Sequence, residues 1–166
     1  MPDELKLIDA LFWAGAALAA ILLWAARGPY SMWMVQLPGT LAHELAHYLV
    51  ALVTLSSPSP MSLQLKRTAQ TWELGSITFR PGRWTAGLVA LAPAWVLPLC
   101  VYGLWREAGV SGATFNIIAG YLAVTLALGS VPSRTDWAIA FRYPVGTFIL
   151  FAVAAALFWG TLFEKG

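Results

Sequence analysis

The chain has 166 residues, of which 59% are hydrophobic and only 11% are charged, and its formal net charge is +2. Ordinary globular domains have about 45–50% apolar and about 25% charged residues, so this composition predicts a protein whose surface faces lipid. The small net charge argues against nucleic acid as a partner. The single cysteine excludes an intramolecular disulfide.

Five apolar segments are long enough to cross a bilayer as helices, which takes roughly 20 residues. They run from about 10 to 26, 32 to 55, 84 to 105, 113 to 129 and 143 to 163. The leader carries Asp3, Glu4 and Asp9 against one lysine, which predicts an uncleaved anchor for the first segment, since a secretory leader is positive. Pro38-Gly39 predicts a break or irregular turn in the second segment.

The only sizeable polar insert lies between the second and third segments, and its sequence alternates with period two. Ser62 to Lys66 and Ser76 to Arg80 each alternate polar and apolar residues, with a polar connector holding Gly75 between them. This pattern predicts a small β-hairpin over residues 62–80. Its edge is a candidate for holding an extended peptide, and the alternative is a plain connector on the membrane surface.

We therefore predict an all-α polytopic membrane protein, with about five transmembrane helices and the hairpin insert, forming one membrane-embedded domain over residues 1–166. The distribution of lysine and arginine sets the expected orientation, because these residues gather on the cytoplasmic side. One side holds Lys6, Lys66, Arg67, Arg80, Arg83, Arg134 and Arg142, and the other holds Arg27, Arg106 and Lys165. This predicts a cytoplasmic N-terminus in a multi-pass protein, and the compact form is typical of a prokaryotic inner membrane.

The segment His43-Glu44-Leu45-Ala46-His47 carries the clearest chemistry, and it holds both histidines of the chain. Residues four apart share a helix face, so His43 and His47 can present imidazole nitrogens to one Zn²⁺ ion. Glu44 can then take a proton from zinc-activated water as general base. Such side chains are costly in an apolar helix, and a metal offsets that cost. We predict one zinc ion per chain; the alternatives are packing histidines bonded to Glu44, or a metal site without hydrolysis.

Asp136 is the predicted third metal ligand, because catalytic zinc usually has three protein ligands and the chain has no third histidine. It follows a proline break, is followed by Trp137 and further apolar residues, and falls at the membrane depth expected for the second histidine. The alternative ligands are Glu73 in the hairpin connector and Cys100 in an apolar stretch. Asp136 could instead form an ion pair with Arg134 or Arg142.

The order of these features resembles the site-2 protease class of intramembrane zinc metalloproteases. The resemblance covers roughly Gly39 to Arg142, with HELAH as its specific part and Ala92-Pro93 as a weaker counterpart of a Gly-Pro feature. The class typically has Leu-Asp-Gly around its aspartate, whereas Asp136 lies between threonine and tryptophan, as in a minimal, divergent member. The resemblance implies proteolysis of membrane-embedded or membrane-adjacent segments.

The expected function is therefore an intramembrane zinc metalloprotease that acts on transmembrane proteins or peptides within the lipid bilayer. Asn116 in the fourth segment is a candidate oxyanion donor, and the alternative is a residue that joins two helices. Two other functions remain open. One is a non-catalytic metal-binding scaffold or inactive relative that binds transmembrane partners, against which Glu44 argues. The other is a zinc hydrolase of lipid amides, in which the hairpin would have no evident function.

Overall fold

The computed structural model describes residues 2–26, 28–59, 62–67, 72–76, 82–108 and 113–163. Its helices are α1 (Pro2–Ala25), α2 (Pro29–Val53), α3 (Ala86–Ala90), α4 (Ala92–Ala108), α5 (Ala113–Gly129), α6 (Arg134–Arg142) and α7 (Pro144–Phe163). The strands β1 (Ser62–Arg67) and β2 (Trp72–Ser76) lie between α2 and α3 in the chain. The third predicted segment is divided into α3 and α4, and α6 has no predicted counterpart.

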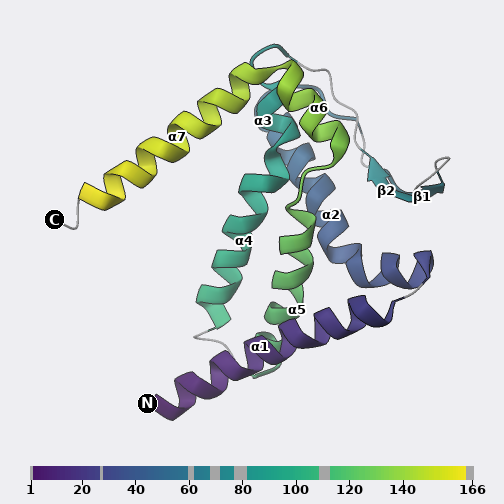
Figure 1. The fold of residues 1–166 in the computed structure, drawn as a ribbon, viewed down its shortest axis with the longest axis vertical. Coiled ribbons are helices and arrows are strands. Elements are labelled where there is room, and N and C mark those ends of the chain that lie inside the picture. The colour runs from purple at the N-terminus through teal and green to yellow at the C-terminus, as the bar shows by residue number, and fades with distance from the viewer. Residues whose placement is uncertain are drawn as a thin grey trace.

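Helix α5 is the central element, because it contacts α1, α2 and α4. Figure 1 shows α1 crossing one end of α5, while α4 and much of α2 run from that end toward the other. Helices α3 and α6 contact each other at the opposite end, and α7 extends away from the body there. The short helices α3 and α6 therefore close the end of a bundle built from α2, α4 and α5.

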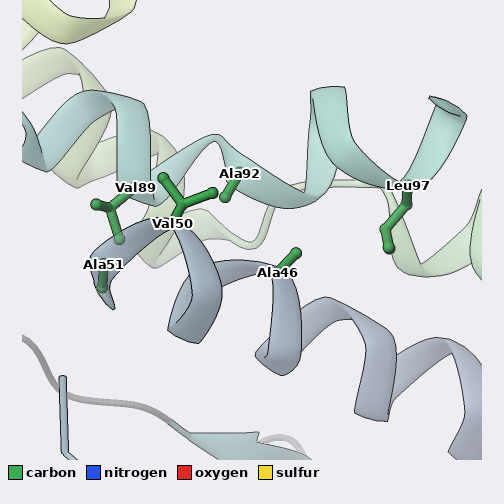
Figure 2. Packing of buried hydrophobic residues seen from close by; sticks show 6 residues of the cluster. All are labelled: Ala46, Val50, Ala51, Val89, Ala92 and Leu97. Atoms are coloured by element: carbon green, nitrogen blue, oxygen red, sulfur yellow. The ribbon is translucent and has the colours of Figure 1, made fainter. Parts of the chain in front are cut away.

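Small side chains allow α2 to pack closely on α3 and α4. The buried residues of this cluster are Ala46, Val50, Ala51, Val89, Ala92 and Leu97, and Figure 2 shows them between the facing helices. Small residues let helix backbones approach, which favours van der Waals contact and hydrogen bonds between helices. A second buried cluster, which includes Phe12 and Ala119, joins α1, α4 and α5. The first cluster holds the helix face next to His47 against the junction of α3 and α4.

Helix α2 continues through Pro38 and Gly39, so the predicted break at this dipeptide is wrong. A proline inside a helix lacks the N–H that would bond to the carbonyl four residues earlier, and the helix bends in response. The ribbon of α2 bends along its length (Figure 1). The dipeptide therefore belongs to one bent helix, whose later part carries His43 and His47.

The prediction of five single transmembrane helices is also wrong. Among the described residues no single helix is both long and apolar enough to cross a bilayer. Helices α5 and α6 meet this requirement only together, as a pair that bends by 53° between Thr114–Gly129 and Arg134–Arg142. The apolar parts of α1 and α7, at Asp9–Ala25 and Pro144–Val153, are shorter than a span. A turn at Leu91 divides the third segment, and its longer part α4 has only 17 residues.

The strand pairing differs from the predicted hairpin in the position of its second strand. Strands β1 and β2 are antiparallel, with Leu65 opposite Leu74 and Arg67 opposite Trp72. The prediction placed a connector with Gly75 where the structure has β2, which ends at Ser76, and residues 77–80 of the predicted second strand lie outside the described part of the chain. The sequence of β2 alternates as well, and pairing it with β1 closes a shorter loop, which costs less chain entropy.

Candidate metal centre

The structure brings His43, His47 and Asp136 together, which are the residues that the sequence predicts as ligands. One ligand atom from each lies within 4.8 Å of the others. The two imidazoles project from successive turns of α2, as residues four apart on a helix do, and Asp136 comes from the first turn of α6. His47 is 5% exposed and Asp136 is 8% exposed, so the group is largely shielded from solvent.

The donor atoms of the three side chains lie close to one another. The Nε2 atoms of His43 and His47 lie 3.1 Å apart. Oδ2 of Asp136 lies 3.5 Å from Nε2 of His43, and Oδ1 lies 3.4 Å from Nε2 of His47. Neighbouring ligand atoms of a tetrahedral zinc ion, with ligand distances of ~2.0–2.1 Å, are ~3.3 Å apart. The spacings between the three side chains therefore suit three ligands of one tetrahedral ion.

A close approach of α2 and α5 orients His43. Its Nδ1–H donates to the carbonyl oxygen of Gly129, at 2.6 Å. That carbonyl is available because α5 ends at Gly129, and the last carbonyls of a helix have no partner within it. A Cβ at Gly39, one turn before His43, would lie 2.1 Å from the carbonyl oxygen of Thr125. The glycine therefore allows the helix contact that sets this hydrogen bond.

His47 is oriented by the junction of α3 and α4. Its Nδ1–H donates to the carbonyl oxygen of Val89, at 2.8 Å. In a continuous helix that carbonyl would accept from the N–H of residue 93, but Pro93 has no N–H. The proline therefore leaves the Val89 carbonyl available, and the small residues of the core hold it against α2.

Asp136 is fixed by the start of α6. Its Oδ2 accepts from the backbone N–H of Ser133 at 2.7 Å, and its own N–H donates to Oγ of Ser133 at 3.2 Å. This reciprocal pair is a capping box, in which the third helical residue and the capping residue satisfy each other's N–H groups. The carboxylate faces both imidazoles, which is a different placement from the predicted alternative of an ion pair with Arg134 or Arg142.

These hydrogen bonds determine what the centre can bind. A carbonyl oxygen only accepts, so each Nδ1 carries a proton and each neutral imidazole presents a lone pair at Nε2. Two lone pairs and a carboxylate thus converge within about 3.5 Å of one another. One extra proton could offset the repulsion between acceptors at one of these contacts, whereas a metal cation at the centre would offset it at all three. Backbone carbonyls behind metal-bound imidazoles are the usual second layer of such sites.

Glu44 lies beside the centre rather than in it. The residue is 8% exposed, and its carboxyl is within electrostatic range of His43, His47 and Asp136. Of the alternative ligands, Cys100 is exposed on α4 and lies outside the three-residue group. The side chain of Glu73 is outside the described part of the structure.

The proposed oxyanion role of Asn116 does not fit the structure. Asn116 is fully buried on α5, and it lies 13 residues before Gly129 along the helix, which is about 20 Å. The alternative interpretation, a residue within helix packing, fits its position near the contact of α5 with α1.

The sequence predictions assign no role at the centre to several residues that shape it: Gly39, Val89, Pro93, Gly129 and Ser133. The sequence carries a local signal for only some of them. Ser133-x-x-Asp136 matches a capping box, and Pro93 marks a missing helix hydrogen bond. No protein-family model, curated protein or solved structure matches the chain.

Proposed function

We propose that the chain is a zinc-dependent peptidase, in which His43, His47 and Asp136 bind the metal. The observation that carries this proposal is the convergence of two imidazole nitrogens and one carboxylate, at N–N and N–O distances of 3.1 to 3.5 Å, while the Nδ1–H groups of both histidines donate to backbone carbonyls. The resemblance of the HELAH segment to the site-2 protease class points to the same activity.

The donor set favours zinc over other common cations. Two imidazole nitrogens and one carboxylate suit Zn²⁺, whereas Mg²⁺ and Ca²⁺ prefer ligands that are all oxygen. Three protein ligands at one face of a tetrahedron leave the fourth corner for water or substrate, as in catalytic rather than structural zinc sites. The second layer of backbone carbonyls would hold both imidazoles in the orientation that binding needs.

Glu44 is the residue that makes hydrolysis, rather than metal storage, the better proposal. A bound zinc ion would act as a Lewis acid on a water molecule and on the carbonyl of the scissile peptide bond. Glu44 takes a proton from the attacking water and delivers it to the nitrogen of the leaving amine as the C–N bond breaks. A purely structural site has no use for this buried carboxyl.

The surface of the molecule supports a substrate in or beside a membrane. Large apolar side chains are exposed on α1, α2, α4, α5, α6 and α7, with Trp24 at 79%, and Leu55, just after α2, is 89% exposed. Soluble monomers rarely expose extended apolar surface, and lipid or a partner covers it where it occurs. We propose that lipid covers it here, and that the substrates are peptide bonds of membrane-embedded or membrane-adjacent segments.

The test compares the purified full chain with Glu44→Gln in detergent, measuring zinc content and cleavage of a set of transmembrane peptides. Both proteins are expected to bind about one zinc, as the centre has one metal position. The variant is expected to cleave at least about 100-fold more slowly, because general-base catalysis contributes ~10²–10⁴-fold.

Two controls make the result decisive. The double variant His43→Ala plus His47→Ala is expected to lose both zinc and cleavage, and a chelator followed by added zinc is expected to abolish and restore wild-type cleavage. Equal cleavage by wild type and Glu44→Gln would remove Glu44 as the base. Zinc binding by wild type without cleavage of any peptide would favour the non-catalytic metal-binding scaffold.

A further inference from the structure

A pocket with two arginines lies at the junction of α6 and α7, apart from the metal centre. Its volume is about 440 Å³, and it is lined by Arg83, Arg142, Tyr143, Pro144 and Val145. Arg142 is the last residue of α6, about 9 Å along that helix from Asp136. Arg83 comes from the turn that precedes α3, 59 residues earlier in the chain.

Close packing of α3 on α7 brings these two segments together. A Cβ at Gly87 of α3 would lie 2.5 Å from the carbonyl oxygen of Tyr143. A Cβ at Gly146 of α7 would lie 2.7 Å from the carbonyl oxygen of Trp84. The two glycines therefore allow a backbone contact that fixes the positions of the residues next to Arg83 and Arg142.

Among the described residues, no carboxylate balances the charge of the pocket. In the part of the chain that the structure describes, both ion pairs of Asp136 go to histidines, and neither Arg83 nor Arg142 has a carboxylate partner. The guanidinium of Arg142 instead lies 5.9 Å from the centre of the Tyr143 ring. Two like charges at one pocket repel each other unless an anion lies between them. Guanidinium groups match the geometry of phosphate oxygens, which makes phosphate the fitting anion.

Apolar side chains adjoin the two arginines. Trp84 follows Arg83 in the chain and Phe141 precedes Arg142, and they are 70% and 75% exposed. Beyond the pocket, α7 exposes Phe148 and Ile149. A ligand that pairs with both features has a phosphate at one end and a hydrocarbon part next to it.

We propose that this pocket binds the phosphate of an anionic phospholipid head group, with the acyl chains along the exposed apolar residues of α7. Basic pockets of membrane proteins commonly bind such head groups on the side where anionic lipid gathers. A free phosphate ion would use the arginines but not the apolar residues, so the lipid is the better match. This site goes beyond the proposed peptidase and does not depend on its activity.

The test measures binding of dioctanoyl phosphatidylglycerol to the full chain in mild detergent, with dioctanoyl phosphatidylcholine and inorganic phosphate as comparison ligands. Arg83→Gln plus Arg142→Gln is expected to bind the anionic lipid about 30-fold more weakly, since each arginine near anionic lipid contributes a factor of about five. The matched control, Arg106→Gln plus Arg134→Gln, removes the same charge from exposed positions outside the pocket.

Retained affinity in the control and in Glu44→Gln, together with an unchanged unfolding temperature in all variants, would support the lipid site separately from the peptidase. Equal affinity for the two lipids, or an equal loss in both arginine double variants, would overturn the site. Competition by inorganic phosphate at the same concentration as the lipid would assign the pocket to a free phosphate ion and overturn the lipid assignment.

Discussion

Helix α5 buries polar groups near both of its ends, but the two ends differ in what surrounds these groups. At the end near α6, the Gly129 carbonyl accepts from His43, and His43 and His47 face Asp136. Toward the other end, Asn116 is buried in the region where α5 packs against α1. In the sequence, the two histidines and Asn116 are all polar residues within apolar segments, and all of them are candidates for the functional site.

The difference shows that burial of a polar side chain does not by itself identify a site. Asn116 is a single neutral amide that can both donate and accept, so its burial does not call for a cation. The centre on α2 instead collects three acceptors from two helices, while its N–H donors are used by backbone carbonyls. This convergence of acceptors is the feature that separates the two ends of α5, and the proposed zinc ion would offset the repulsion between them.

Removing the charge of Asp136 is expected to have the largest effect. Asp136→Asn keeps an oxygen that can accept from Ser133 N–H, but it replaces a charged ligand with a neutral one. Zinc affinity is expected to fall more than about 100-fold, beyond the ~10–100-fold that loss of a supporting residue causes. Metal competition titration measures the affinity.

Ser133→Ala is the control for Asp136→Asn, because it weakens the cap of α6 and leaves the ligand in place. It is expected to lower the free energy of unfolding by about 1 kcal/mol with a much smaller loss of zinc. Unchanged zinc affinity in Asp136→Asn would move the third ligand to Glu73 or Cys100.

Pro93→Ala tests the hydrogen bond that orients His47 and leaves the three proposed ligands unchanged. The new backbone N–H can bond to the Val89 carbonyl and withdraw it from His47. Zinc affinity is expected to fall about 10–100-fold, as for other residues behind a ligand. Pro98→Ala, in the same helix, is the matched control and is expected to leave the affinity unchanged. An equal loss in both variants would point to a general change in α4 instead.

Gly39→Ala tests the close approach of α2 and α5. Its Cβ would meet the Thr125 carbonyl at 2.1 Å, so the helices must separate and His43 must move from Gly129. The free energy of unfolding is expected to fall by about 1–3 kcal/mol, as for other overpacked sites. At Gly103 a Cβ meets nothing within 4 Å, so Gly103→Ala is expected to be neutral or up to about 1 kcal/mol stabilising. Denaturant unfolding in detergent distinguishes them, and equal stability of the two variants would contradict the close contact.

Asn116→Ala is expected to have the smallest effect on the centre. Sites separated by more than about 7–10 Å act independently, so zinc affinity is expected to change less than about twofold. Cleavage is expected to change as little. A drop in cleavage without a change in protein stability would return Asn116 to the list of catalytic candidates.

The sequence could predict which residues converge at the centre because their signals are local. The spacing of His43 and His47 lies within one helix, and Asp136 stands out as an acidic residue next to apolar ones. The start of α6 was also open to prediction, since Ser133 and Asp136 have the spacing of a capping box. The bond from His47 to Val89 joins residues 42 apart, and that from His43 to Gly129 joins residues 86 apart, so no local pattern reports them.

The prediction of five single transmembrane helices failed for a different reason. Composition reports how apolar the chain is, but not how its helices are divided. A turn at Leu91 separates α3 from α4, and the bend after α5 separates it from α6. The length of an uninterrupted helix, on which a single span depends, is set by these interruptions.

X-ray absorption at the zinc edge, on the purified full chain, tests the composition of the metal centre most directly. We expect about one zinc per chain, with nitrogen and oxygen ligands at ~2.0–2.1 Å and an imidazole scattering pattern that corresponds to two histidines. A sulfur ligand at ~2.3 Å would place Cys100 at the metal, and a chain without bound zinc would contradict the centre itself.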